Sequence, residues 1–369
     1  MSAATMEPNP KLALTLRELS ACQHLARTHI TFSLTLACPL KCAHCIVDAG
    51  PERTATTMPL AIAERYAAQM PAIARHGICG VSFTGGEPFV ARPQLECMSE
   101  AADAAGLEVS VVTAAHWART ADRARAVVER FRGIRYWDIS FDAHHLPWVG
   151  IDHVRHAAEA IRGAGRKVNI RVTYSDPMTP EDRQVMEALH AIGEEDYLTQ
   201  GMRPVGRGQD IHQPVQHGWS PWIKPCVTQG MVVRYDGTVA PCCLNLVESR
   251  DHPFMFGDPR VDDLVAVHGR FITDPLLQLI RALGFGPIRE WIRDEGLEQF
   301  LPDPLPEEVC ELCTAIMHNP KLAQLAQARA SEGDVPVKIG VLTAKILGET
   351  DMLRALGQSA IIEQLDVPQ

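Results

Sequence analysis

The sequence predicts an α/β fold in which a parallel sheet wrapped by helices forms a partial (β/α)6 barrel of the TIM type. Six runs of apolar and β-branched residues alternate with helical patterns between residues 30 and 205, which is typical of parallel strands joined by helical crossovers. Right-handed crossovers curl such a sheet toward a barrel. Polar and sulfur-bearing residues follow several of these runs, and barrels of this type place their chemistry at the carboxyl ends of the strands.

The predicted elements follow one another in a regular order. A helix over 11–26 precedes the first strand, and Gly106 and Gly165 are placed to end two of the later helices. The strands are expected at Ile30–Leu36, Ile78–Thr84, Leu107–Thr113, Ile134–Phe141, Val168–Tyr174 and Asp196–Met202. The helices that connect them are expected at Pro59–His76, Arg92–Ala105, Arg119–Phe131, Ile151–Ala164 and Pro180–Ile192.

The pattern changes after Arg203, where clustered glycines and prolines indicate a linker. Two short strands, 231–234 and 238–240, flank Asp236–Gly237 and predict a β-hairpin, and residues 274–300 are predicted to be helical. We therefore expect four parts, which are an N-terminal extension (1–29), the barrel (30–205), a small second domain (206–318) and a C-terminal helical tail (319–369).

Composition narrows the class of protein. The chain has 369 residues, 46% of them apolar, and a formal net charge of −10 without a long basic run, so we expect no nucleic-acid partner. We find neither a signal peptide nor a run of roughly 18 apolar residues that could cross a membrane, and expect a cytoplasmic protein. In a reducing compartment, the 11 cysteines are more often metal ligands than disulfide partners.

Three cysteines, Cys38, Cys42 and Cys45, come directly after the first predicted strand. Thiolates are soft ligands that suit an iron–sulfur cluster or zinc. A four-iron cluster needs four ligands, so three leave one iron open for a substrate or cofactor. The alternative is a structural zinc site that His44 or a distant residue completes.

Two further groups follow later strands. Gly85-Gly86-Glu87-Pro88 ends the second strand, where glycines permit close backbone approach and the carboxylate can accept hydrogen bonds from an ammonium group. Ser140 and Asp142 alternate at the end of the fourth strand, so their side chains share a face and suit a ribose diol.

Together these motifs resemble those of the radical S-adenosylmethionine superfamily over residues 30 to 205. The resemblance implies that the open iron of a [4Fe-4S] cluster chelates S-adenosylmethionine and that an electron from the cluster splits it to a 5′-deoxyadenosyl radical. It also implies a position for His44 beside the adenine, for the Gly-Gly-Glu-Pro turn on the methionine amino group, and for Ser140 and Asp142 on the ribose. Arg171 would bind the methionine carboxylate or substrate, unless it forms a salt bridge inside the barrel. Thr113 and Val205 lie where members of the superfamily contact the cofactor.

A second group of cysteines comprises Cys226, Cys242, Cys310 and Cys313, and could close a site completely. A zinc ribbon is the alternative, although Cys226 and Cys242 are far apart for a zinc knuckle. The order resembles that of the twitch module, a shortened relative of the SPASM module, which implies one auxiliary [4Fe-4S] cluster. The spacing from Gly237 favours Cys242 over its neighbour Cys243 as the ligand.

The resemblance implies a radical oxidoreductase that takes hydrogen from a substrate and uses an external electron donor such as flavodoxin or ferredoxin. We expect a small molecule such as a sugar or aminocyclitol, because the 37 residues before Cys38 are too few for the peptide-binding domain of many peptide-modifying relatives. The alternatives are a maturase of ribosomally made peptides and a non-catalytic zinc or cluster-binding scaffold. The candidates for contact with substrate are Arg171, His144, His145 and Tyr174, of which His145 or Arg171 could act as a general base.

Overall fold

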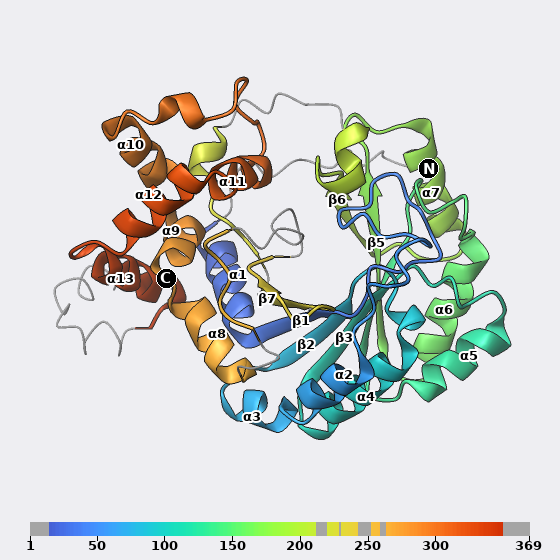
Figure 1. Cartoon of the computed structure of the whole chain (residues 1–369). Helices are drawn as coiled ribbons and strands as arrows, with labels where there is room; N and C mark the ends of the chain where they lie inside the picture. The colour runs from blue at the N-terminus through green and yellow to red at the C-terminus, as the bar shows by residue number, and fades with distance from the viewer. Residues whose placement is uncertain (1–14, 212–219, 229, 243–251, 259–262, 350–369) are drawn as a thin grey trace, which may run out of the picture.

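The computed structural model describes residues 15–211, 220–228, 230–242, 252–258 and 263–349. Its centre is one curved sheet with the strand order β6-β5-β4-β3-β2-β1-β7-β8 (Figure 1). The six strands β1 to β6 run parallel to their neighbours, as predicted. Strand β7 also runs parallel to β1, which was not predicted, and β8 is antiparallel to β7. The strands are β1 His29–Ser33, β2 Gly80–Thr84, β3 Glu108–Thr113, β4 Tyr136–Ser140, β5 Lys167–Tyr174, β6 Tyr197–Gly201, β7 Met231–Arg234 and β8 Val239–Ala240.

Helices cover the outer side of the sheet and gather at one end of it. Helices α2 to α7 lie along the strands β2 to β5, while α8 to α13 gather around α1 and β7 (Figure 1). The helices are α1 Leu16–Thr28, α2 Leu60–Ala67, α3 Met70–Arg75, α4 Arg92–Ala104, α5 Ala121–Arg130, α6 Ile151–Gly163, α7 Pro180–Ala191, α8 Leu264–Thr273, α9 Pro275–Leu283, α10 Gly286–Asp294, α11 Val309–Met317, α12 Pro320–Ala330 and α13 Val335–Leu347.

The helix predicted over Pro59–His76 is in fact two helices. Helix α2 ends at Ala67 and α3 begins at Met70, with Pro71 in its first turn. A proline lacks the amide hydrogen and its ring clashes with the preceding turn, so it is tolerated only at the start of a helix. The single-helix prediction was therefore wrong at Pro71.

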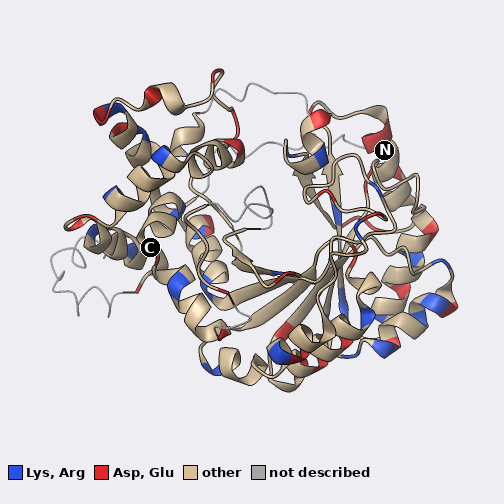
Figure 2. Cartoon of the chain, in the orientation of Figure 1, with Lys and Arg blue, Asp and Glu red and all other residues tan. Residues whose placement is uncertain are grey.

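The outer face of the sheet is apolar and forms the core. Phe32, Phe83 and Trp137 point toward the helices and are completely buried, and the ring of Phe32 lies 5.7 Å from that of Tyr66 on α2. Figure 2 shows that charged residues of both signs are interspersed on the outer helices, while the strands carry few. This arrangement gives the helices one apolar side against the sheet and one charged side toward water.

The inner, concave face of the sheet is polar. His29 hydrogen-bonds to Ser82 at 2.7 Å, and Ser82 contacts Ser110 on the next strand. Because paired residues of neighbouring strands point to the same side, the same face carries Asp138 and Arg171 further along the sheet. The sequence alternation therefore separates a packed outer face from an inner face that suits a polar ligand.

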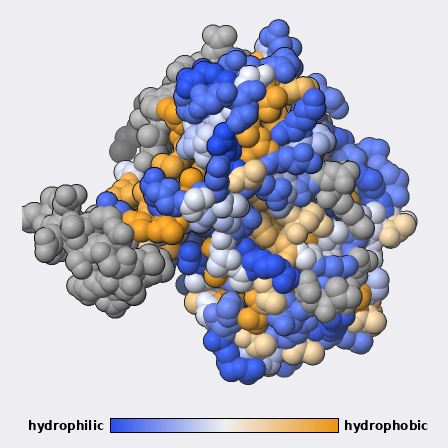
Figure 3. All heavy atoms as spheres, turned by 60° about the vertical axis from the view of Figure 1, so that its left-hand side comes forward, coloured by the Kyte–Doolittle hydropathy of each residue, from blue (hydrophilic) through white to orange (hydrophobic). Residues whose placement is uncertain are grey.

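The hairpin β7–β8 belongs to the same sheet as the barrel strands. Strand β7 pairs with β1 from Ile30–Met231 to Ser33–Arg234, across the boundary predicted after residue 205. Figure 3 shows apolar patches among hydrophilic residues on the face that includes the C-terminal helices. Among the described residues, no helix is both long and apolar enough to cross a membrane.

Candidate functional site

The loop that follows β1 carries Cys38, Cys42 and Cys45, and backbone amides donate to two of the three sulfurs. The amide of Leu40 donates to the Cys38 sulfur and the amide of Ala49 donates to the Cys45 sulfur, each at 3.4 Å. Such hydrogen bonds stabilise thiolates and tune the potential of a cluster. Burial and the nearby Glu87 carboxylate raise the pKa of Cys38 to about 12, so this thiolate needs a metal cation to form at neutral pH. The donor set therefore fits a metal cluster.

The Gly-Gly-Glu-Pro turn after β2 lies against the chain that leads to this loop. A Cβ on Gly85 would lie 2.3 Å from the carbonyl oxygen of Thr35, and one on Gly86 would lie 2.5 Å from that of Ala37. Gly85 also has a φ of +139°, which side chains rarely adopt. The glycines thus provide close contact between the turn and the approach to Cys38.

Glu87 is buried at the centre of a hydrogen-bond network. Its carboxylate accepts from the Thr113 hydroxyl at 2.9 Å and from the amides of Ala114 at 3.0 Å and Phe89 at 3.2 Å. The Nδ1 atom of His116 lies 3.5 Å away. Two predicted cofactor residues, Glu87 and Thr113, are therefore in direct contact, while Pro88 begins a short 3-10 helix behind them.

A segment after β6 holds the cysteine loop from the other side. The amide of Arg207 donates to the Cys45 carbonyl at 3.0 Å, and its guanidinium donates to the Cys42 carbonyl at 3.0 Å and to Asp48 at 2.6 Å. Gly206 has a φ of +58° and lies so close that a Cβ would be 2.4 Å from the Cys45 carbonyl oxygen. Val205, predicted to contact the cofactor, is buried in this segment.

Asp142 contacts three histidines next to the cysteine loop. Its side chain, which is 1% exposed, lies 2.8 Å from His145 Nδ1, 3.0 Å from His44 Nε2 and 3.0 Å from the His144 amide. The rings of His44 and His144 stack with centroids 4.6 Å apart. His145 is buried and lies near Cys42.

The charges in this group depend on one another. Burial alone would lower the pKa of His145, but the Asp142 carboxylate and Cys42 raise it to about 10. Burial would raise the pKa of Asp142, yet His145 and His44 hold it far below its usual range. Asp142 therefore lies beneath the loop as an anion that orients His44 and His145.

Arg171 lies on the inner face of β5, level with Ser140 on β4, and forms an ion pair. Its guanidinium donates to Asp138 at 2.7 Å, and Asn169 donates to the same carboxylate at 3.1 Å. Tyr174 ends the strand half-buried, and burial raises its pKa. Asp138 belongs to no predicted motif, and its only signal in the sequence is its alternation with Ser140 on one strand face.

The four later cysteines come together. Burial and the surrounding Cys226, Cys242 and Cys310 raise the pKa of Cys313 well above its usual value. Cys226 and Cys242 flank the β7–β8 hairpin, whereas Cys310 and Cys313 lie one turn apart on α11. Cys243 lies outside the described residues.

The spacing of the sulfurs bears on the kind of metal site. Within the described part of the chain, only His44, Asp142 and His145 bring three ligand atoms within 4.8 Å of one another. The sulfurs around one tetrahedral zinc lie about 3.8 Å apart, given a zinc–sulfur bond of about 2.3 Å. In neither cysteine group do three of the described sulfurs all lie within 4.8 Å of one another.

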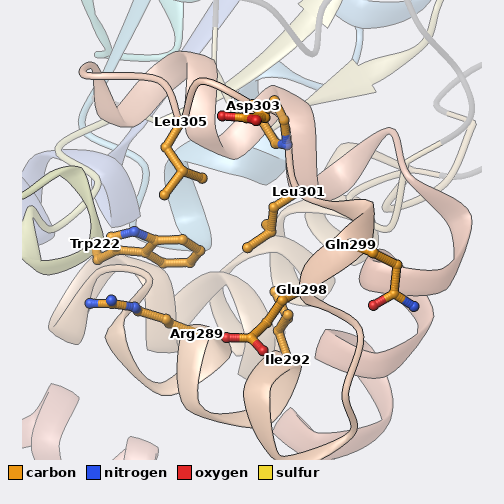
Figure 4. A pocket seen from close by; sticks show the side chains of 9 residues that line it. Trp222, Arg289, Ile292, Glu298, Gln299, Leu301, Asp303 and Leu305 are labelled. Atoms are coloured by element: carbon orange, nitrogen blue, oxygen red, sulfur yellow. The ribbon is translucent and has the colours of Figure 1, made fainter.

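A separate cavity of about 520 Å³ lies among the C-terminal helices (Figure 4). The Trp222 ring forms one wall, with the Arg289 guanidinium 5.6 Å from its centre, and Leu301 and Leu305 face the same hollow. None of the residues predicted for the cofactor or metal sites lines this cavity.

Comparison with known proteins places the fold. No family model matches the chain, and no curated protein does. The structure of native anSMEcpe with bound AdoMet has a TM-score of 0.50 and 15% identity, covering 82% of this chain and 98% of that one. For anSMEcpe with AdoMet and Cp18Cys peptide the TM-score is 0.49, with 15% identity and coverage of 84% and 99%. For BtrN with AdoMet and 2-DOIA it is 0.40, with 14% identity and coverage of 71% and 89%. The likeness to the first of these shows that the chain shares the fold of that protein, whose counterpart here is the curved parallel sheet with helices on its outer side.

Proposed function

We propose that this chain reductively cleaves S-adenosylmethionine and takes a hydrogen atom from a small polar molecule. The observation that carries the proposal is the loop of Cys38, Cys42 and Cys45, which is held between the Glu87 turn and the Arg207 segment. A [4Fe-4S] cluster bound there would supply the electron that splits the sulfonium bond of the cofactor, delivered by flavodoxin, ferredoxin or a similar donor.

The residues around the loop have roles that their contacts support. The Glu87 carboxylate is placed to hold the methionine ammonium group, and the network of Thr113 and Ala114 fixes its orientation. The stacked rings of His44 and His144 offer a flat surface for the adenine, with Asp142 orienting His44. Ser140, at the end of β4, would contact the ribose of the cofactor in this proposal.

The inner face of the sheet supports a polar substrate. Its serines, with the Asp138–Arg171 ion pair, provide hydrogen-bond donors and acceptors rather than apolar surface. In this proposal Arg171 and Tyr174 position the substrate, and His145 stays beneath the loop. A second [4Fe-4S] cluster at Cys226, Cys242, Cys310 and Cys313 would accept an electron as the substrate is oxidised.

The test is anaerobic reconstitution with iron and sulfide, followed by reduction in the presence of S-adenosylmethionine. We expect about eight irons per chain and release of 5′-deoxyadenosine. Cys42→Ala abolishes this release, whereas Cys79→Ala, at an exposed thiol, retains it. One bound zinc without cofactor cleavage would refute the proposal and support a non-catalytic scaffold.

The auxiliary site is tested separately. Cys313→Ala is expected to remove about four irons while 5′-deoxyadenosine release, which depends on the first loop, continues. Cys242→Ala should lose the same amount and Cys243→Ala should not, because the spacing from Gly237 favours Cys242, whose thiol lies near Cys313. Equal losses in these two variants would contradict the ligand assignment.

A further inference from the structure

Arg281 on α9 carries a positive charge into the interior of the protein. Its side chain is among the largest that are completely buried, with the residue 2% exposed. The guanidinium donates to Gln23 Oε1 at 2.9 Å and to the carbonyl oxygens of Thr228 at 3.2 Å and Cys22 at 3.3 Å. Gln23 in turn donates to the Arg281 carbonyl at 2.9 Å, which fixes the pair.

The hydrogen-bond partners of Arg281 are neutral, and no described carboxylate forms an ion pair with it. Its electrostatic neighbours are Arg27, which repels it, and the thiols of Cys226 and Cys22. An arginine side chain keeps its proton even when buried. A buried charge without a counter-ion costs several kcal/mol, so a guanidinium that has none among the described residues is stabilised by an anion placed next to it.

The backbone places the guanidinium directly behind Cys226. The Cys226 amide donates to the carbonyl of Ile280, the residue before Arg281, at 3.0 Å. The Arg281 guanidinium in turn binds the carbonyl of Thr228, two residues after Cys226. Cys226 lies near Cys313 with the other auxiliary cysteines, so an anion at that site is next to Arg281.

We propose that Arg281 is the buried counter-charge of an anionic four-thiolate cluster at the auxiliary site and that it adapts this cluster to accept an electron. This inference rests on the proposed auxiliary cluster. Four thiolates give such a cluster a net negative charge that grows by one on reduction. A fixed cation beside it stabilises the reduced form and therefore raises its reduction potential.

The experiment uses the full chain with Cys38, Cys42 and Cys45 changed to Ala, so that only the auxiliary cluster is loaded. Iron content and midpoint potential are measured after anaerobic reconstitution. Arg281→Gln is expected to lower the iron content and to shift the potential to more negative values, whereas Arg281→Lys keeps the charge and stays near the parent potential. Arg293→Gln, at an exposed ion pair on α10, is the matched control and leaves both quantities unchanged.

A purely structural role for Arg281 predicts a different result. Gln23→Leu removes a hydrogen-bond partner but not the charge, so it keeps the parent potential if the charge is what matters. Arg281→Gln with full iron and the parent potential would overturn the inference and leave the proposed cluster intact. If Arg281→Gln does not fold, the other two variants decide. The inference is overturned if Gln23→Leu shifts the midpoint potential or if Arg281→Lys loses iron. A parent variant that binds no iron would instead overturn the auxiliary cluster itself.

Discussion

The contact between Gly206 and the cysteine loop gives a sharp prediction for Gly206→Ala. The left-handed backbone at φ +58° costs about 1–2 kcal/mol for alanine. The new Cβ would lie 2.4 Å from the Cys45 carbonyl oxygen, where ordinary contact needs 3.4 Å, so the loop and the segment must separate. That separation breaks the two hydrogen bonds from Arg207 to the carbonyls of Cys45 and Cys42, each worth about 1 kcal/mol. The loop arrangement is therefore destabilised by about 3–4 kcal/mol, or roughly a hundredfold to a thousandfold.

The assay is the iron content after reconstitution together with 5′-deoxyadenosine release. We expect Gly206→Ala to lose about four irons and all cofactor cleavage while it keeps the auxiliary cluster. Gly193→Ala is the matched control, because Gly193 has a similar φ of +82° but nothing within 4 Å of the added Cβ. A Gly206→Ala variant that loads iron like the wild type would refute the idea that the contact between Gly206 and the cysteine loop holds that loop in place.

Three further predictions concern stability. Burial and the neighbouring His76 lower the pKa of His268 to about 4, which is below its pKa of about 6.5 in the unfolded chain. The free energy of unfolding therefore falls as the pH drops through 6.5, by about 2 kcal/mol between pH 7 and pH 5. Denaturant titrations should show that His268→Leu loses this part of the pH dependence. Thr113→Val removes a hydrogen-bond donor to the buried Glu87 and an acceptor for Trp117, so it should lower the free energy of unfolding by about 3 kcal/mol in the same titrations. An unchanged denaturation midpoint would contradict a stabilising role for these hydrogen bonds. A fragment that ends at residue 205 lacks β7 and exposes the edge of β1, so size-exclusion chromatography should show aggregates rather than a monomer.

The repeating part of the fold could be predicted from the sequence because each strand carries its own signal. The alternation of Ile30 and Phe32 with polar neighbours fixes both a strand and its buried face. The partner of β7 could not be predicted, because Met231–Arg234 gives the same pattern whether it pairs with β1 or forms a separate sheet. Long-range pairings depend on three-dimensional packing that a local pattern does not encode.

Part of the proposed site has a local sequence signal. The spacing of Cys38, Cys42 and Cys45 and the Gly-Gly-Glu-Pro turn can each be recognised within a few residues. The contacts of Arg207 with Cys42 and of Arg281 with the Cys226 segment join residues that are far apart in the chain. An arginine gives no sequence signal of whether it will be exposed or buried, so only the structure identifies Arg281 as a buried cation.

The ladder between β1 and β7 has a consequence for communication between the two cysteine groups. Strand β1 leads directly into the loop of Cys38, and the hairpin that begins with β7 is flanked by Cys226 and Cys242. Strand β7 pairs with β1 over its whole length, so the two segments are held in one sheet. In the proposed enzyme, this pairing would set the distance between the two clusters without one domain having to close onto another.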